Sequence, residues 1–176
     1  MIIRLAELAD LNACYELDGS YTTNYVWQMQ AREHERSVEV RFDAVRLPRS
    51  MKVAYPRHRD ELLPNWRQGE CFLVAAEAAG KPIALLDMTT QAWHGVGWIR
   101  NLIVHRDFRR QGVATALLRA ARHWALDNEL IKLTLETQTK NYPAISFAQK
   151  HRFAFCGYND RYYSNGDIAV FFSLSL

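Results

Sequence analysis

The sequence has few cysteines and no long apolar run, and each scarcity excludes a class of protein. Its three cysteines, Cys14, Cys71 and Cys156, are far apart and odd in number, so we expect neither a disulfide framework nor a cysteine metal site. No apolar stretch approaches the roughly 20 residues that span a membrane. The first residues lack the basic head and apolar core of a secretion signal. We therefore expect a cytoplasmic protein without membrane association.

A large excess of charge of one sign is also missing. The 22 basic and 19 acidic residues leave a net charge of +3, which is too small to indicate a nucleic-acid partner. No group of histidine, cysteine or carboxylate residues has metal-ligand spacing, so no metal is expected. The hydrophobic share of 49% and the length of 176 residues are typical of one globular domain.

The hydrophobic pattern predicts antiparallel strands followed by alternating strands and helices, which together indicate a mixed α/β sheet. The first part is expected to hold a helix over 6–17, a hairpin that turns around 34–37, and a short helix near 59–63. Further along the chain we expect strands at 71–77, 82–89, 98–104 and 131–136, helices at 112–127 and 143–151, and two last strands at 153–158 and 168–174.

The most informative motif runs from Leu102 to Thr115 and joins a strand, a basic turn and an amphipathic helix that begins at Gly112. The start of a helix has unpaired N–H groups and a partial positive charge, so it binds anions. A glycine at this point lets the backbone approach a phosphate closely. The alternative is an ordinary helix start beside solvated arginines. The strand before the motif and the long helix after it favour a phosphate cradle.

These residues resemble a known family. Arg109-x-x-Gly112-x-Ala114 resembles the acyl-CoA pyrophosphate motif of the GNAT superfamily of N-acetyltransferases. Asn141-x-x-Ala144-x-x-Phe147 resembles that family's second helix motif. The resemblance covers about 71–176. Segments 135–138 and 167–172 are, more narrowly, similar to streptothricin acetyltransferases.

The resemblance implies one GNAT acetyltransferase domain over residues 1–176, with an acceptor side in 1–70 and an acyl-CoA-binding core in 71–176. Its fold would be a mixed, mostly antiparallel central sheet flanked by helices, with a splayed strand pair that admits acetyl-CoA. The cofactor residues that it implies are Leu102, Ile103, Val104, Arg109, Arg110, Gln111, Gly112, Val113, Ala114, Thr115, Asn141 and Phe147.

The catalytic residues are less well defined. Ala148 stands where family members usually carry a proton-donating tyrosine. Tyr142, or alternatively Tyr158, is a substitute acid, although a thiolate can also leave unprotonated. Glu136 is the candidate base because it projects on the polar face of its strand; a solvated strand charge is the other interpretation.

Two positions on the strand expected at 98–104 also differ from the streptothricin acetyltransferases. Arg100 and Asn101 stand where the streptothricin relatives have acidic residues. We expect Arg100 to share a strand face with Leu102 and Val104, and to reach past them to water. If it points into the site instead, it would favour an acceptor that carries a carboxylate.

On the acceptor side, Asp18, Tyr25 and Trp27 suit a cationic amine through ion pairing and cation–π contact. Packing within the hairpin is the alternative for the two aromatic residues. The sequence therefore predicts acetyl transfer from acetyl-CoA to a primary amine of a small molecule, such as a streptothricin-like antibiotic. A protein or peptide acetyltransferase and a non-catalytic CoA-binding module are the alternatives, and a homodimer is left open.

Overall fold

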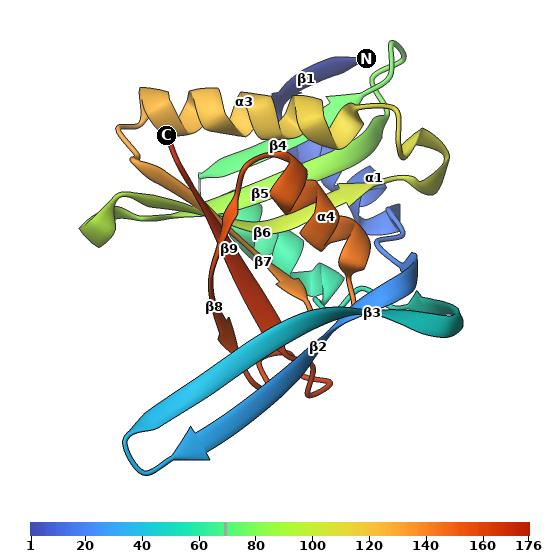
Figure 1. Ribbon diagram of the computed structural model, residues 1–176. Helices are drawn as coiled ribbons and strands as arrows, with labels where there is room; N and C mark the ends of the chain where they lie inside the picture. The colour runs from blue at the N-terminus through green and yellow to red at the C-terminus, as the bar shows by residue number, and fades with distance from the viewer. Residues whose placement is uncertain (69) are drawn as a thin grey trace.

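The central sheet has seven strands in the order β1-β4-β5-β6-β7-β9-β8 among residues 1–68 and 70–176, which the computed structural model describes (Figure 1). Neighbouring strands are antiparallel except β6 and β7, which are parallel. The strands are β1 (Ile2–Leu5), β4 (Cys71–Ala76), β5 (Pro82–Gln91), β6 (Val96–Val104), β7 (Lys132–Gln138), β8 (Ala154–Asn159) and β9 (Ala169–Ser175). The expectation of a mixed, mostly antiparallel sheet is confirmed.

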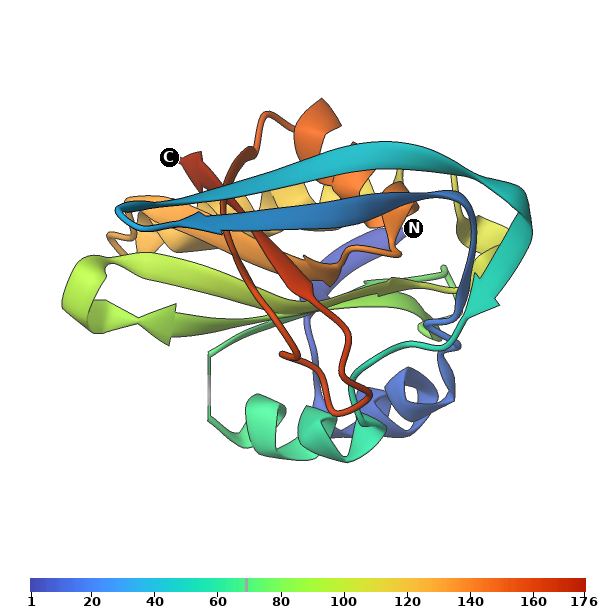
Figure 2. The ribbon, with the colours of Figure 1, turned by 60° about the horizontal axis from the view of Figure 1, so that its bottom comes forward.

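Helices cover both faces of this sheet (Figure 2). Helices α3 (Val113–Asp127) and α4 (Tyr142–Lys150) pack on one face, and α1 (Leu11–Glu16) and α2 (Leu62–Arg67) on the other. In the described part of the chain, four 3-10 turns connect the elements: η1 (Leu8–Asp10), η2 (Arg59–Glu61), η3 (Ala92–His94) and η4 (Arg106–Phe108).

The helix expected over 6–17 is wrong in its first part, because a 3-10 turn precedes a shorter α1. The Asp10 carboxylate accepts hydrogen bonds from the Glu7 N–H (2.7 Å) and from the Arg4 guanidinium. Such a carboxylate lies in the first helical turn, and the residue whose N–H it accepts, here Glu7, is the cap that precedes the helix. Residues 6 and 7 therefore lie outside the helix.

Side chains that alternate along the middle strands fill two separate cores. Leu73 and Leu86 pack with α3 and α4, while Val74 and Leu85 pack with α1 and α2. Successive side chains of a strand point to opposite faces, so a strand that is apolar throughout is buried on both sides. The doubly covered sheet is the rigid frame on which the site is built.

Strands β6 and β7 pair only over Val96–Ile99 and Lys132–Leu135, and then diverge. The expected splayed strand pair is therefore present. At the point of divergence β6 has a bulge, because Asp87 pairs with Asn101 and the next residue of β5 pairs with Ile99, which leaves Arg100 between them.

The bulge changes the direction of Arg100. A bulge shifts the alternation of side chains along its strand, and Arg100 donates to Asn65 (3.1 Å) of α2. Leu102 and Val104 pack toward the opposite face, with α3. The expectation that Arg100 shares their face is wrong, and Arg100 lines the cavity described below.

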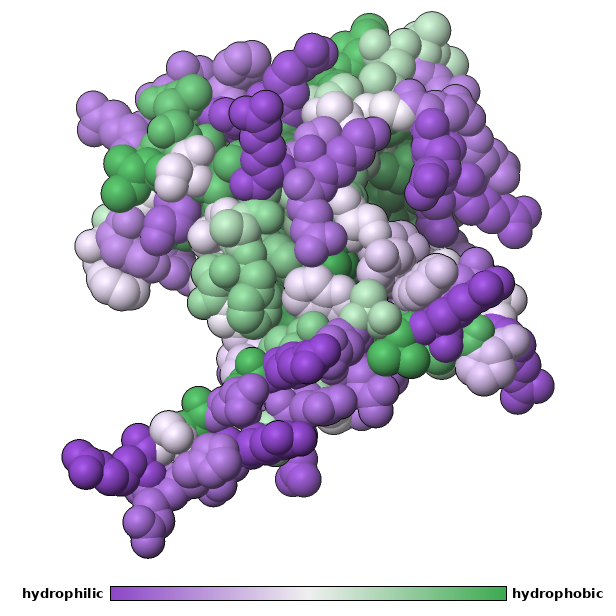
Figure 3. Space-filling view, viewed as in Figure 1, coloured by the Kyte–Doolittle hydropathy of each residue, from purple (hydrophilic) through white to green (hydrophobic). Residues whose placement is uncertain are grey.

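Strands β2 (Tyr21–His34) and β3 (Ser37–Val53) form a separate antiparallel hairpin with the predicted turn. Its far end projects beyond the sheet (Figure 1), and its surface there is hydrophilic (Figure 3). The hairpin is attached midway along β2, where the Trp27 ring lies 5.6 Å from that of Phe172 in β9 and 6.0 Å from that of Phe155 in β8. An isolated two-stranded ribbon is marginally stable, so this aromatic packing fixes its position.

Candidate active site

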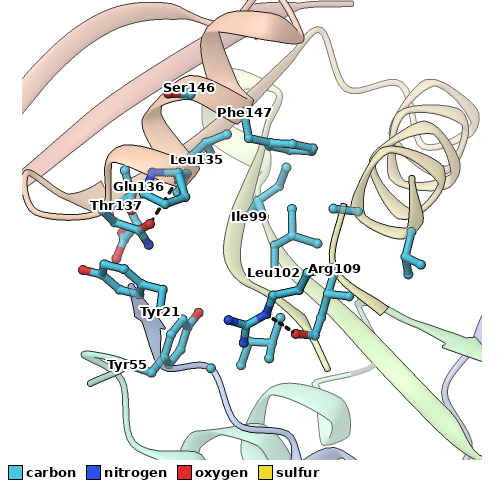
Figure 4. A pocket seen from close by; sticks show the side chains of 18 of the residues that line it. Tyr21, Tyr55, Ile99, Leu102, Arg109, Leu135, Glu136, Thr137, Ser146 and Phe147 are labelled. Carbon is cyan, nitrogen blue, oxygen red and sulfur yellow. Dashed lines mark hydrogen bonds between the residues drawn. The ribbon is translucent and has the colours of Figure 1, made fainter. Parts of the chain in front are cut away.

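A cavity of about 490 Å³ opens where β6 and β7 diverge. The start of α3, the inner side of α4 and the loop before η2 form its other walls. Figure 4 shows Phe147 of α4 on one side of this space, with Tyr21 and Tyr55 across from it. The cavity joins the basic turn after β6 to the fork between the strands, so one elongated molecule can contact both.

The N-terminus of α3 forms the cradle at one end of this cavity. Gly112 has a φ of +84°, and a Cβ added there would meet nothing within 4 Å. The first backbone bond of the helix is donated by Ala116 to the Gly112 carbonyl (3.0 Å). Within the described residues the N–H groups of residues 110–115 have no backbone acceptor. These open donors and the helix dipole suit a diphosphate.

Two neighbouring arginines of the basic turn have different environments. The Arg109 guanidinium donates to the carbonyls of Val104 (2.9 Å), Ser20 (2.8 Å) and Asp18 (2.7 Å). Its hydrogen-bonding groups are engaged by the protein, so it holds the turn in place. Arg110 is exposed at the cavity and can place its charge near a phosphate.

Two residues near the end of α4 complete this part of the wall. Lys150 adds a second exposed positive charge. The His151 ring lies 3.1 Å from the Thr115 hydroxyl. Burial, with the nearby charges of Lys150 and Arg122, lowers the pKa of His151. The imidazole therefore offers hydrogen bonds rather than charge at neutral pH.

The structure brings together eleven of the twelve residues that the resemblance implied for the cofactor. Gln111 does not line the cavity wall, and its side-chain amide donates to the Asp107 carbonyl (2.8 Å), but its backbone N–H belongs to the open helix start. Asn141 caps α4 by accepting from the Ala144 N–H (3.1 Å). The eleven that line the cavity are Leu102, Ile103, Val104, Arg109, Arg110, Gly112, Val113, Ala114, Thr115, Asn141 and Phe147.

Glu136 lies at the fork between the strands, and its side chain is 1% exposed. One carboxylate oxygen accepts from Arg57, and the other from the Trp98 indole N–H (2.9 Å) and the Tyr162 hydroxyl (2.8 Å). The interpretation of Glu136 as a solvated strand charge is wrong, because Arg57, Trp98 and Tyr162 cover its carboxylate.

A chain of polar contacts continues from Arg57 into the protein. Arg57 donates to Glu61 (3.2 Å), and Arg100 donates to the same carboxylate (3.0 Å). Arg100 also contacts Asn65, whose amide donates to Asp87 (2.6 Å). Burial raises the pKa of Asp87 above its ordinary value. Apart from Asp87, the chain of contacts holds two carboxylates, Glu136 and Glu61, and two guanidinium groups, Arg57 and Arg100.

The tyrosines proposed from the sequence as acids do not line the cavity. Tyr142 packs against Tyr25 with ring centroids 5.1 Å apart, and Tyr158 packs against Phe42 of the hairpin. Tyr163, from the loop between β8 and β9, is buried and lines the cavity. Burial raises the pKa of its hydroxyl, so the group keeps its proton.

The three acceptor residues expected from the sequence are not brought together. The Asp18 carboxylate accepts from the N–H and hydroxyl of Ser20 (both 2.9 Å) and serves as a turn residue. Tyr25 lies against Tyr142, and Trp27 belongs to the aromatic packing of the hairpin. In place of these three, Tyr21, Tyr55 and Arg57 line the cavity.

Arg57, Tyr55 and Tyr163 are site residues that sequence reasoning missed. Arg57 and Tyr55 come from the irregular segment after β3, and Tyr163 from the irregular loop before β9. Neither segment has a motif or a periodic pattern that would mark these side chains. Arg57 is recognised as a site residue only by its contact with Glu136, which lies 79 positions further along the chain.

The mixed sheet with its diverging strand pair is the fold of the GNAT family, and a comparison with protein families agrees. Residues 24–153, more than half of the chain, match the acetyltransferase (GNAT) family. This chain belongs to that family. Enzymes of the family use acetyl-CoA, the cofactor that the resemblance implied.

Two curated proteins show what the chain is similar to. Streptothricin acetyltransferase A of Bacillus subtilis is 40% identical over 83 residues, which are 45% of this chain and 48% of that protein. Human N-alpha-acetyltransferase 30 is 32% identical over 104 residues, 58% of this chain and 28% of that protein. The chain thus matches about half or less of the length of these relatives.

Two solved structures share the fold. A nourseothricin acetyltransferase is 24% identical, with a TM-score of 0.83 and coverage of 99% of this chain and 97% of the other. A streptothricin acetyltransferase homologue of Bacillus anthracis, in complex with acetyl coenzyme A, is 22% identical, with a TM-score of 0.75 and the same coverage. Among the described residues, no helix is long and apolar enough to cross a membrane, and no cluster of three potential metal ligands occurs.

Proposed function

We propose that this chain transfers the acetyl group of acetyl-CoA to a primary amine of a small molecule. One observation carries the proposal: a single cavity connects the open helix start at Gly112 with the strand fork at Glu136. The first end suits the diphosphate of the cofactor, and the second is where an acceptor amine can meet the thioester.

The residues present fit acetyl-CoA. The unpaired N–H groups from Arg110 to Thr115 and the charges of Arg110 and Lys150 would hold its diphosphate. The diverging backbone of β6 at Leu102 to Val104 and the ring of Phe147 would flank the pantetheine arm. Because no Cβ occupies the space in front of Gly112, a phosphate can approach the backbone there.

Acetyl-CoA supplies an activated acetyl thioester, on which the acceptor nitrogen forms a C–N bond while the C–S bond breaks and the sulfur gains the nitrogen's proton. The protein must orient the amine and remove the extra proton of its ammonium form. Glu136, a buried carboxylate at the fork, is the candidate proton acceptor. Tyr163, whose hydroxyl is protonated before transfer, is the candidate donor in place of Ala148, which is buried in the core; it would give its proton to the sulfur and regain the one that the nitrogen loses.

One relative and the residues at the acceptor end of the cavity support a small-molecule acceptor. The similarity to streptothricin acetyltransferase A makes streptothricin-like antibiotics the first acceptors to test. Tyr21 at the base of the hairpin and Tyr55 border the acceptor end of the cavity, which supports a small acceptor.

A peptide amine is the second candidate, because the similarity to N-alpha-acetyltransferase 30 extends over more residues than that to the streptothricin enzyme. The test is a turnover assay with acetyl-CoA that measures free thiol and identifies the product by mass spectrometry. Acceptors are a streptothricin, pentane-1,5-diamine, 5-aminopentanoate and short peptides with free N-termini.

We expect thiol release with at least one small amine, and slower release with the peptides. Preferred turnover of peptides would replace the small-molecule assignment. Tight CoA binding without acetyl transfer to any acceptor would identify a CoA-binding module instead.

A further inference from the structure

Arg57 occupies a position that no other charged residue of the described chain shares. It lies in the irregular segment between β3 and η2, and it lines both the main cavity and a second cavity of about 240 Å³. Gly19 and Tyr55 also border both cavities. Arg57 therefore stands in the partition between the two spaces.

The partner of Arg57 is the single acidic residue in the described wall of the main cavity, Glu136. The side chains of Arg57 and Glu136 are 15% and 1% exposed. A buried carboxylate needs a counter-charge, and removing it is strongly unfavourable. The two other donors to Glu136, Trp98 and Tyr162, are neutral, so the charge of Glu136 depends on Arg57.

We propose that Arg57 is a specificity-determining residue, whose guanidinium holds the place on Glu136 that the ammonium group of a cationic acceptor takes. This inference rests on the proposed function of the same site. One cation replaces another, so the negative charge of Glu136 keeps a positive partner during the exchange. An acceptor without a positive charge has no means of displacing the guanidinium, and the site discriminates against it.

The surroundings of Arg57 allow the exchange. Its other Nη atom donates to Glu61 (3.2 Å), a carboxylate that is 36% exposed, so a displaced guanidinium keeps a counter-charge. The second cavity provides space on the far side of the partition. A side chain in a close-packed core lacks such space. The acceptor therefore competes with one ion-pair contact and not with the whole interaction of Arg57.

Displacement predicts that removal of the guanidinium strengthens acceptor binding. The apparent affinity for an acceptor equals the intrinsic affinity multiplied by the fraction of molecules in which the site is free. If Arg57 leaves Glu136 free in about a tenth of the molecules, Arg57→Gln increases the affinity roughly tenfold. A guanidinium that bound the acceptor directly would have the opposite effect.

The experiment is a calorimetric titration of pentane-1,5-diamine and 5-aminopentanoate into CoA-saturated protein, which measures binding whether or not acetyl transfer occurs. We expect Arg57→Gln to bind the diamine roughly tenfold more tightly than the parent. The double variant Arg57→Gln, Glu136→Gln should lose this gain, because no carboxylate remains to receive the ammonium. Arg41→Gln, which removes an exposed ion pair on the hairpin, is the control and should bind like the parent.

Unchanged or weaker diamine binding by Arg57→Gln overturns the proposal, as does absence of diamine binding in both proteins. Weaker binding of 5-aminopentanoate alone would make Arg57 an anchor for a carboxylate instead. If Arg57→Gln does not fold, Arg57→Lys replaces it, since a single ammonium cannot reproduce both guanidinium contacts. A gain of the same sign is then expected, and equal affinity overturns the proposal. Failure of acetyl transfer with intact diamine binding would count against the proposed function and not against this exchange.

Discussion

The Nε atom of Arg109 donates a hydrogen bond to the carbonyl of Val104, 2.9 Å away, and so closes the turn between β6 and α3 (Figure 4). The same side chain reaches the carbonyls of Ser20 and Asp18 in the loop after α1. Arg110, the next residue, is exposed and has a left-handed φ of 64°. Neighbouring residues of one basic motif therefore act differently, the first on the shape of the turn and the second on its charge.

This difference predicts separate effects of the two arginines. Arg109→Gln should lower the free energy of unfolding by about 2 kcal/mol, since it removes hydrogen bonds from a charged donor. Arg110→Gln should change it by less than about 0.5 kcal/mol, but should weaken CoA binding at low salt more than at high salt. Urea unfolding measures the change in stability, and calorimetry at two salt concentrations measures the change in CoA binding. A loss of stability in Arg110→Gln equal to that in Arg109→Gln would contradict the distinction.

Gly112 and Gly80 form a matched pair for testing the phosphate cradle. Both have a left-handed φ, +84° and +86°, and a Cβ at either would meet nothing within 4 Å. Substitution by glutamate should cost a similar ~1 kcal/mol of stability at each, because side chains disfavour this conformation. Only Gly112→Glu places bulk and negative charge in the cradle, so it alone should abolish CoA binding in calorimetry. If Gly112→Glu binds CoA as tightly as the parent, the helix start at Gly112 does not bind the diphosphate.

Tyr163 and Tyr142 test which hydroxyl serves as the acid. Tyr163→Phe should lower kcat by about 10²–10⁴-fold, with little change in the KM for acetyl-CoA, because the hydroxyl acts on the chemical step. Tyr142→Phe should keep its activity, since Tyr142 packs against Tyr25 and does not line the cavity. Steady-state kinetics decide between them. Full activity in Tyr163→Phe would mean that the thiolate leaves without this donor.

Trp27 should matter for stability and not for acceptor binding. Its ring packs with those of Phe42, Phe155 and Phe172, and Trp27→Ala should reduce the free energy of unfolding by about 3 kcal/mol. The control is Trp93→Ala, because Trp93 is 85% exposed and its loss should cost less than about 0.5 kcal/mol. A raised acceptor KM in a stably folded Trp27→Ala protein would restore Trp27 to the acceptor site.

The buried Asp87 predicts a pH-dependent stability. Burial raises the pKa of Asp87 in the folded protein, while an unfolded aspartate titrates near about 3.9. Between these two pKa values the folded state binds more protons, so the free energy of unfolding falls as pH rises. Asp87→Asn cannot ionise and keeps an oxygen to accept from Asn65.

The stability of Asp87→Asn relative to the parent should therefore increase from about pH 4 upward. Urea unfolding across this range measures the difference, with Asp43→Asn on the exposed hairpin as the control. A difference that stays constant with pH would show that Asp87 is ionised in the folded protein.

Local patterns were sufficient to predict most of the fold and the helix start at Gly112. The two-residue alternation of strands and the apolar stripe of α3 are properties of contiguous sequence, and so is the succession of strand, basic turn and glycine that ends at Gly112. The unpaired N–H groups of a helix start follow from its hydrogen-bond geometry alone. Eleven of the twelve implied cofactor residues accordingly line the cavity.

The acceptor end depended on the tertiary structure. A bulge of one residue at Arg100 turns that side chain to the other face of the sheet, and no periodic pattern reveals such an insertion. Tyr21 reaches Gln138 across 117 positions of the chain, and Arg57 reaches Glu136 across 79. A residue in an irregular segment has no repeating pattern to indicate its neighbours. The packing of the hairpin and loops around the strand fork therefore decides which charges meet there.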